Sequence, residues 1–94
     1  MISVKVYEKS RRQKRINVNL PVTYVCSGES NINPREGVAS DVCQEGMSFY
    51  TDTPLKEGLD LQIQTSMWKS PKKCTIKWRS KKSRNIYKVG VSFL

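Results

Sequence analysis

The sequence of 94 residues contains no histidine, and its three cysteines, Cys26, Cys43 and Cys74, are far apart in the chain. Histidine is the commonest general base and metal ligand near neutral pH, so its absence rules out a cysteine–histidine nucleophile. No two cysteines have the Cys-x-x-Cys spacing of a zinc or redox site, and their odd number argues against a disulfide framework. We therefore expect a protein that is not an enzyme and that holds neither a metal nor a cofactor.

Long apolar runs are missing as well. No segment approaches the roughly 18 apolar residues that a membrane-spanning helix requires, so membrane insertion is not expected. Residues 1–7 lack the apolar core and the small-residue cleavage site of a signal peptide. The sequence therefore predicts a cytoplasmic protein, and its 37% hydrophobic and 27% charged residues are typical of a globular domain.

A helical pattern is also absent, because no segment keeps a 3.6-residue apolar stripe over the ten or so residues that a helix needs. Apolar residues instead occupy every second position, most clearly from Ile16 to Cys26. Pro21 has no N–H to donate, so we expect an edge or a bulge beside it. Six such segments predict an all-β fold, a small six-stranded antiparallel β-barrel that forms a single domain. They comprise residues 16–26, 36–41, 47–51, 59–65, 74–79 and 87–93.

The last two predicted strands are joined by a strongly basic segment, and we expect residues 80–85 to form the turn between them. Trp78 alternates with Cys74 and Ile76, which predicts that its indole packs in the core. Trp68 lies in a predicted loop. The cations in this part of the chain are compatible with a solvated face, a second anion site or a docking surface: Lys77, Arg79, Lys81, Lys82 and Arg84.

Acidic residues are missing from residues 66–94, which carry nine Lys and Arg residues. Residues 1–20 carry six cations and one acid, whereas residues 21–65 carry two cations and seven acids. The net charge of +9 therefore lies at the two ends of the chain. Such asymmetry indicates an anionic partner, which is a nucleotide, a nucleic acid or a membrane surface.

Four of the cations, Arg11, Arg12, Lys14 and Arg15, fall within five residues directly before the first predicted strand. An arginine presents a planar fork of N–H donors that stays charged at physiological pH, and two such forks can converge on one anion. The block therefore predicts a phosphate clamp. A solvated basic arm is the alternative for the same residues.

Three elements of the sequence share the order and spacing of a known family. Arg11-x-x-x-Arg15 precedes the first strand, Asp41-x-Cys43-x-x-Gly46 follows further on, and Tyr87–Phe93 closes the series. Together they resemble the PilZ domain, whose signature is Arg-x-x-x-Arg followed by Asp/Asn-x-Ser-x-x-Gly. The resemblance covers residues 9–94. It implies a six-stranded β-barrel that binds the bacterial second messenger cyclic di-GMP, with a flexible basic N-terminal arm, residues 1–15, that folds over the ligand.

The resemblance assigns the ligand contacts position by position. Arg11 and Arg15 match the two arginines of the arm, Asp41 matches the acidic residue and Gly46 the glycine, while Cys43 stands where the family has serine. Guanidinium forks suit the phosphodiesters of cyclic di-GMP, and a carboxylate accepts hydrogen bonds from the N–H groups of guanine. Replacing a hydroxyl by a weakly donating thiol is expected to lower the affinity on the order of fivefold.

Several of these residues have a second interpretation. Asp41 is also suited to cap a turn, and Cys43 to pack as a small hydrophobe under the loop. Gly46 suits either a positive φ or a close approach to another group, such as the purine. The remaining arm residues play supporting roles: Arg12 and Lys14 strengthen the local field, and Ser10 lies where the family's variability influences how many ligand molecules stack.

The resemblance implies a receptor that signals to an unidentified effector protein when cyclic di-GMP orders the arm. Two alternatives from other classes fit the same sequence. One is a degenerate barrel that no longer binds nucleotide and docks to proteins of pilus or flagellar motility, which Cys43 favours. The other is a nucleic-acid-binding β-barrel, which the charge, Trp68 and Trp78 suggest, although nucleic acid is the less expected partner.

Overall fold

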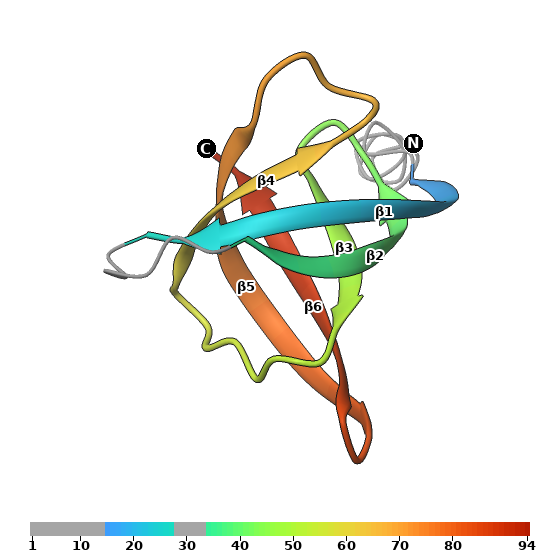
Figure 1. Ribbon diagram of the computed structural model, residues 1–94, viewed down its shortest axis with the longest axis vertical. Coiled ribbons are helices and arrows are strands. Elements are labelled where there is room, and N and C mark those ends of the chain that lie inside the picture. Colours follow the sequence, from blue (N-terminus) through green and yellow to red (C-terminus); the bar gives the residue numbers. More distant parts are fainter. Residues whose placement is uncertain (1–14, 28–33) are drawn as a thin grey trace, which may run out of the picture.

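Six antiparallel strands form a closed barrel in the computed structural model, which describes residues 15–27 and 34–94 (Figure 1). Neighbouring strands follow the order β1-β2-β3-β6-β5-β4, and pairing of β4 with β1 closes the barrel. This confirms the predicted all-β fold. None of the described segments is a helix that is long and apolar enough to span a membrane. The strands are β1 (Ile16–Cys26), β2 (Arg35–Val42), β3 (Gly46–Thr51), β4 (Asp60–Thr65), β5 (Lys72–Ser83) and β6 (Ile86–Phe93).

The core consists of side chains that alternate along the strands and face into the barrel. In β1, Val22, Tyr24 and Cys26 are buried while the residues between them are more exposed, as a period of two requires. Tyr24 packs against Phe49 with ring centroids 5.3 Å apart, and its hydroxyl forms a hydrogen bond of 2.6 Å with the Thr51 hydroxyl. Because a buried phenol needs such a partner, the hydrogen bond allows Tyr24 to fill the core.

Pro21 lies one residue before the point at which β1 begins to pair with β4. The register between β1 and β2 shifts between Asn17 and Leu20, which marks an irregularity just before the proline. Pairing with β4 begins one residue after it, at Val22. The missing N–H of Pro21 therefore falls outside the β4 ladder, and the predicted edge or bulge is confirmed.

β5 and β6 form a hairpin that protrudes from the barrel (Figure 1). β5 continues to Ser83, and Arg84 and Asn85 alone form the turn that leads into β6. The prediction of a turn over residues 80–85 is therefore wrong. The strand was missed because both of its faces are solvated in this region, so no apolar alternation marks it.

Trp78 lies on the outside of the barrel, so the prediction that it belongs to the core is wrong. The β5–β6 register shifts between Ile76 and Trp78, which makes Lys77 an extra residue in β5. Such a bulge reverses the alternation of the residues that follow it. Ile76 is consequently 1% exposed and Trp78 38% exposed, although their spacing in the sequence suggests one common face.

The Cys74 thiol is fully buried between β4 and β6, and this burial perturbs its acidity. Burial, together with the nearby negative charge of Asp60, raises the pKa of Cys74 from 9.0 to about 12. The unfolded chain releases this proton near pH 9, but the folded protein keeps it to about pH 12. The thiol therefore contributes stability that is complete below pH 9 and is lost as the pH rises toward 12.

Replacement of Cys74 by valine is expected to flatten the decline of stability at alkaline pH. Over the range between the two pKa values, the free energy of unfolding of the unmodified protein should fall faster than that of Cys74→Val, by at most about 1.4 kcal/mol per pH unit. Urea unfolding followed by circular dichroism at several pH values measures the difference. Parallel stability curves for the two proteins would show that Cys74 does not titrate differently on folding.

Candidate functional site

Asp41 lies near the end of β2. Its carboxylate binds the side chains of Arg15, which directly precedes β1, and of Ser48, which lies in β3. Its Oδ1 accepts a hydrogen bond of 2.7 Å from Arg15 Nη1, and its Oδ2 accepts one of 2.7 Å from the Ser48 hydroxyl. The strand register brings them together, because Asp41 pairs with Ser48 in β3 and with Asn17 in β1, two residues after Arg15. Within the described residues the carboxylate therefore binds side chains and does not cap a turn.

The ion pair between Arg15 and Asp41 is suited to meeting an anion. The Arg15 side chain is 56% exposed and the Asp41 side chain 16%. A pair with one exposed partner contributes only about 0–1 kcal/mol to stability. Its larger effect is geometric, because Asp41 holds one N–H group of the guanidinium, and no other described residue bonds to the remaining donors, which suit an incoming oxygen.

Gly46 is required where β3 begins, because the backbone of β6 lies directly against it. A Cβ atom at this position would lie 2.1 Å from the Val91 carbonyl oxygen. Its φ is not positive, so of the two predicted reasons for a glycine here the close approach applies. The Gly46 carbonyl also accepts a hydrogen bond of 2.8 Å from the Cys43 N–H, which closes the short connection between β2 and β3.

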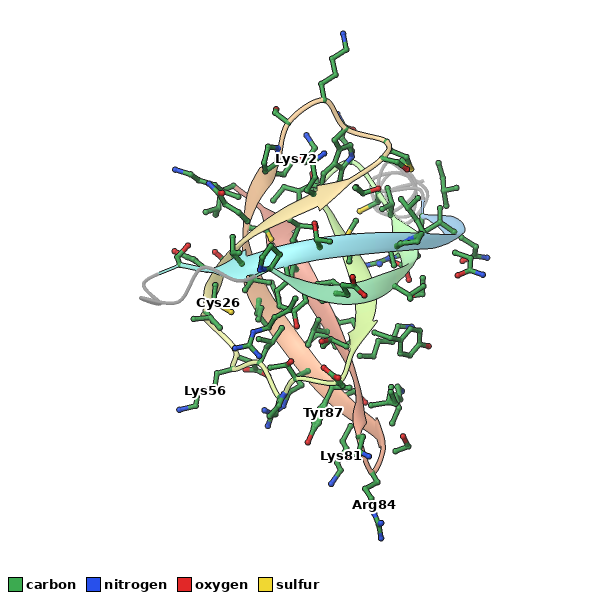
Figure 2. All side chains as sticks on the ribbon, viewed as in Figure 1. Cys26, Lys56, Lys72, Lys81, Arg84 and Tyr87 are labelled. Carbon is green, nitrogen blue, oxygen red and sulfur yellow. The ribbon has the colours of Figure 1, made fainter. Side chains whose placement is uncertain are left out.

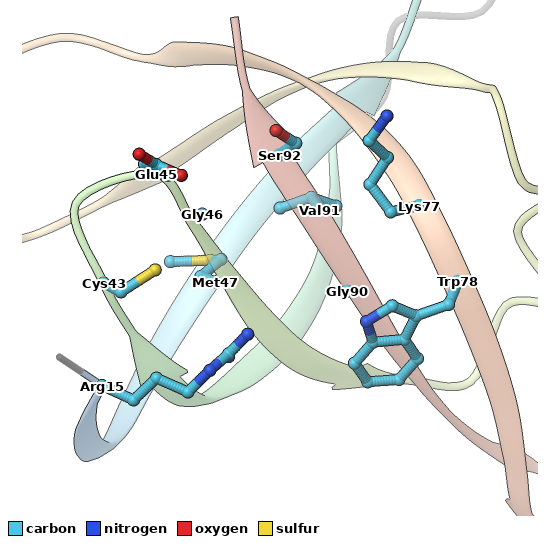
Figure 3. Close-up of a pocket in the computed structure, with 10 residues that line it drawn as sticks. All are labelled: Arg15, Cys43, Glu45, Gly46, Met47, Lys77, Trp78, Gly90, Val91 and Ser92. Carbon is cyan, nitrogen blue, oxygen red and sulfur yellow. The ribbon is translucent and has the colours of Figure 1, made fainter. Parts of the chain in front are cut away.

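A cavity of about 170 Å³ lies between this connection and the outer side of β5 and β6 (Figure 3). The structure brings three of the predicted site residues to it, namely Arg15, Cys43 and Gly46, and places Asp41 beside Arg15. Cys43 is 8% exposed, so it lines the cavity while packing as a small hydrophobe. The cavity is lined by Arg15, Cys43, Glu45, Gly46, Met47, Lys77, Trp78, Gly90, Val91 and Ser92.

Trp78 adds a flat aromatic surface to the cavity, and the sequence analysis missed this role. The indole lies against β6 at Gly90, where a Cβ atom would come within 2.2 Å of the indole Cε2 and Nε1 atoms. The bulge at Lys77 turns the ring outward, and Gly90 makes room for it. A glycine inside the predicted last strand was the signal, since such a glycine often marks the close approach of another group.

Ser48 is a second residue that sequence reasoning missed. It is 1% exposed in a strand of otherwise mainly apolar residues, and its hydroxyl bonds to Asp41 and to the Ser40 hydroxyl, the latter at 3.2 Å. A buried hydroxyl needs such partners, and this one fixes the Asp41 carboxylate on the side away from Arg15. A serine in an apolar strand was the only signal in the sequence.

Arg15 is the one arm residue of the predicted site that the structure describes; the others lie outside the described residues: Ser10, Arg11, Arg12 and Lys14. Their contacts with a ligand remain predictions. In the part of the chain that the structure describes, no group of His, Cys, Asp or Glu side chains is arranged to hold a metal ion. The charged and aromatic side chains that line the described cavity are two cations, Arg15 and Lys77, one acid, Glu45, and the indole of Trp78.

Comparison with known proteins connects this arrangement to a family. The model of the PilZ domain matches residues 9–94. The structure is also similar to a solved PilZ domain with c-di-GMP of YcgR from Escherichia coli, with a TM-score of 0.70 and 17% sequence identity, over 89% of this chain and 77% of that one. A search of curated proteins found no match. At 17% identity, this similarity shows that the two domains share a fold.

Proposed function

Because the chain belongs to the PilZ domain family, a family of cyclic di-GMP receptors, we propose that it binds cyclic di-GMP and signals its presence to an effector protein. One observation carries the proposal. Asp41, fixed by Ser48, holds the half-exposed guanidinium of Arg15 at the edge of a cavity that is also lined by Gly46 and Trp78. This set combines a fork for phosphate oxygens with a flat surface for a guanine.

Each part of the ligand finds a complementary group in this set. The free N–H donors of Arg15 suit a phosphodiester oxygen, which is acceptor-only and anionic. The two carboxylate oxygens of Asp41 each bond one side chain, and an ionised carboxylate has about four acceptor sites, so capacity remains for the N–H groups of guanine. The exposed Trp78 face is suited to stack on the base.

The described cavity accounts for only part of the ligand. Its volume of about 170 Å³ is below the roughly 300–1,000 Å³ of pockets that enclose a drug-sized ligand. We therefore assign the remaining contacts to the arm, with Arg11 as the second phosphate ligand and Arg12, Lys14 and Ser10 in support. Ordering of the arm over the nucleotide would then be the change that an effector reads.

Replacement of Trp78 by leucine is expected to weaken cyclic di-GMP binding about tenfold, because stacking on an aromatic side chain contributes about 1–3 kcal/mol per base. Trp68→Phe is the matched control, since Trp68 packs edge-on against Phe93, 5.5 Å away, and does not line the cavity. Tryptophan fluorescence gives a second readout: the nucleotide should quench the emission of Trp68→Phe and leave that of Trp78→Leu nearly unchanged. Equal affinity of the two variants for cyclic di-GMP would show that Trp78 does not stack on the nucleotide.

A second candidate function is that of a docking barrel without nucleotide, and Cys43 is the observation that favours it. The thiol occupies the serine position of the family motif and is almost buried. Titration calorimetry of the unmodified protein and of Cys43→Ser with cyclic di-GMP distinguishes the two functions. A receptor should bind, and the serine should keep or raise the affinity by up to about fivefold. No heat of binding from either protein at high micromolar nucleotide would contradict the receptor and leave the docking barrel.

A further inference from the structure

The β5–β6 hairpin presents a cluster of cations that the nucleotide site does not use. Figure 2 shows Lys81 and Arg84 at its far end, pointing away from the barrel. Lys81, Lys82 and Arg84 are exposed, and their side chains make no hydrogen bond or ion pair with another described residue. Residues 66–94 contain no acid, so no carboxylate in the hairpin itself offsets this charge.

The backbone edge of the hairpin is poorly suited to accept another strand. β5 pairs with β4 over Lys72–Thr75 and, from Lys77 to Ser83, pairs with β6 alone among the described strands. That free edge contains two irregularities of register and several cations, features that oppose edge-to-edge strand addition. A partner would therefore contact the side chains of the hairpin.

An apolar groove of about 480 Å³ lies on the barrel and reaches the hairpin at Ile86, the first residue of β6 after the turn. Val38, Tyr50 and Ile86 line it, and Val38 and Ile86 are 42% and 39% exposed, which is high for large apolar side chains. Lys88 joins the groove to the cations, because its ammonium group lies 5.5 Å from the centroid of the Tyr50 ring. The groove therefore adjoins the hairpin through Ile86 and Lys88, with apolar residues on the barrel side and cations around the turn of the hairpin.

We propose that this surface docks an acidic segment of a partner protein, which places an apolar side chain in the groove and its carboxylates along the hairpin. Protein interfaces commonly combine an aromatic or aliphatic anchor with a polar rim, as this surface does. Glu36 and Asp52, which also line the groove, would repel acidic residues from its far side and so set the direction of the segment. The proposal goes beyond nucleotide binding and does not depend on it.

The charge and the polarity of the surface favour an acidic protein segment over a second copy of the chain and over nucleic acid. A second copy of the chain would bring a net charge of +9 and an equal cation cluster against the same surface. Nucleic acid would satisfy the cations, but interfaces with nucleic acid are more polar than this one and offer phosphates and sugars, which do not fill an apolar groove. An acidic protein segment with an apolar anchor complements both halves of the surface.

The proposal is tested with a synthetic peptide in which a run of glutamates precedes a leucine, using fluorescence anisotropy at physiological salt. The triple variant Lys81→Ser, Lys82→Ser, Arg84→Ser should bind it about tenfold or more weakly, since each exposed charge pair changes affinity roughly two- to threefold and three pairs are lost. The matched control, Lys56→Ser, Lys69→Ser, Lys73→Ser, removes the same charge from exposed positions elsewhere and should change affinity less than about threefold. Circular dichroism confirms that each variant is folded.

The variant Ile86→Ser distinguishes binding of the leucine in the groove from general attraction between opposite charges. It should weaken binding of the leucine peptide about fivefold and leave unchanged the binding of a peptide in which serine replaces the leucine. Equal losses in the two triple variants, or an Ile86→Ser variant that binds the leucine peptide normally, would overturn the proposal. A DNA duplex that binds more tightly than the peptide, and loses affinity in the hairpin variant alone, would assign the hairpin to nucleic acid and overturn it as well.

Discussion

Replacement of Arg15 by alanine is expected to weaken cyclic di-GMP binding about a hundredfold, because the bound phosphate would lose its guanidinium, and removing one partner of a hydrogen-bonded charge pair that binding buries costs about 2–5 kcal/mol. The substitution removes the N–H donors proposed to bind phosphate. It also leaves the Asp41 carboxylate, whose side chain is 16% exposed, without the cation that lies 2.7 Å from it. Titration calorimetry with cyclic di-GMP measures the loss.

Arg84→Ala is the control for the Arg15 substitution. It removes the same charge from an exposed position at the turn of the β5–β6 hairpin, which does not line the cavity beside Arg15. Its affinity should stay within about twofold of the unmodified protein, because exposed charges act weakly at this distance in salt. Similar losses in both variants would mean that net charge, and not the geometry at Asp41, governs binding.

Replacement of Gly46 by alanine is expected to lower the free energy of unfolding by about 3 kcal/mol or more, the upper range for inserting an atom into a packed region. The added Cβ would lie 2.1 Å from the Val91 carbonyl oxygen, so β3 and β6 would have to separate where they pair. Urea unfolding followed by circular dichroism measures the change. The β2–β3 connection that carries Cys43 would shift with it.

Gly58→Ala tests the cause of that loss. Gly58 has a φ of 86° but open space around its Cβ position, so alanine there meets only the strain of a left-handed backbone, about 1 kcal/mol. Gly46→Ala should therefore be clearly the more destabilising of the two. If the order were reversed, the close contact between Gly46 and Val91 would not limit this position.

The parts of the fold that depend on alternation were predictable from the sequence. Residues 16–26 have an apolar side chain at every second position, and β1 has these same bounds. Trp78 shows where such reasoning fails, because a bulge depends on how β5 pairs with β6 and leaves no mark in the side-chain pattern of β5 alone. Because of this bulge, Trp78 lines the candidate site and does not pack in the core.

The candidate site was predictable where it depends on a motif and not where it depends on how the strands pair. The motif indicated Arg15, Asp41, Cys43 and Gly46, and the structure brings Arg15, Cys43 and Gly46 to one cavity, with Asp41 bonded to Arg15. The role of Gly46 in strand packing required knowing that Val91 lies across from it. Trp78 and the Ser48 contact with Asp41 could be found only once the pairing of strands was known.

The most direct test of the proposed site is a titration of the isotopically labelled protein with cyclic di-GMP, followed by amide and indole N–H signals in nuclear magnetic resonance. The receptor proposal predicts large shifts at Arg15, Gly46 and Gly90 and at the indole of Trp78, with the indole of Trp68 little affected. Shifts confined to the β5–β6 hairpin, or no shifts at saturating nucleotide, would contradict the proposed site.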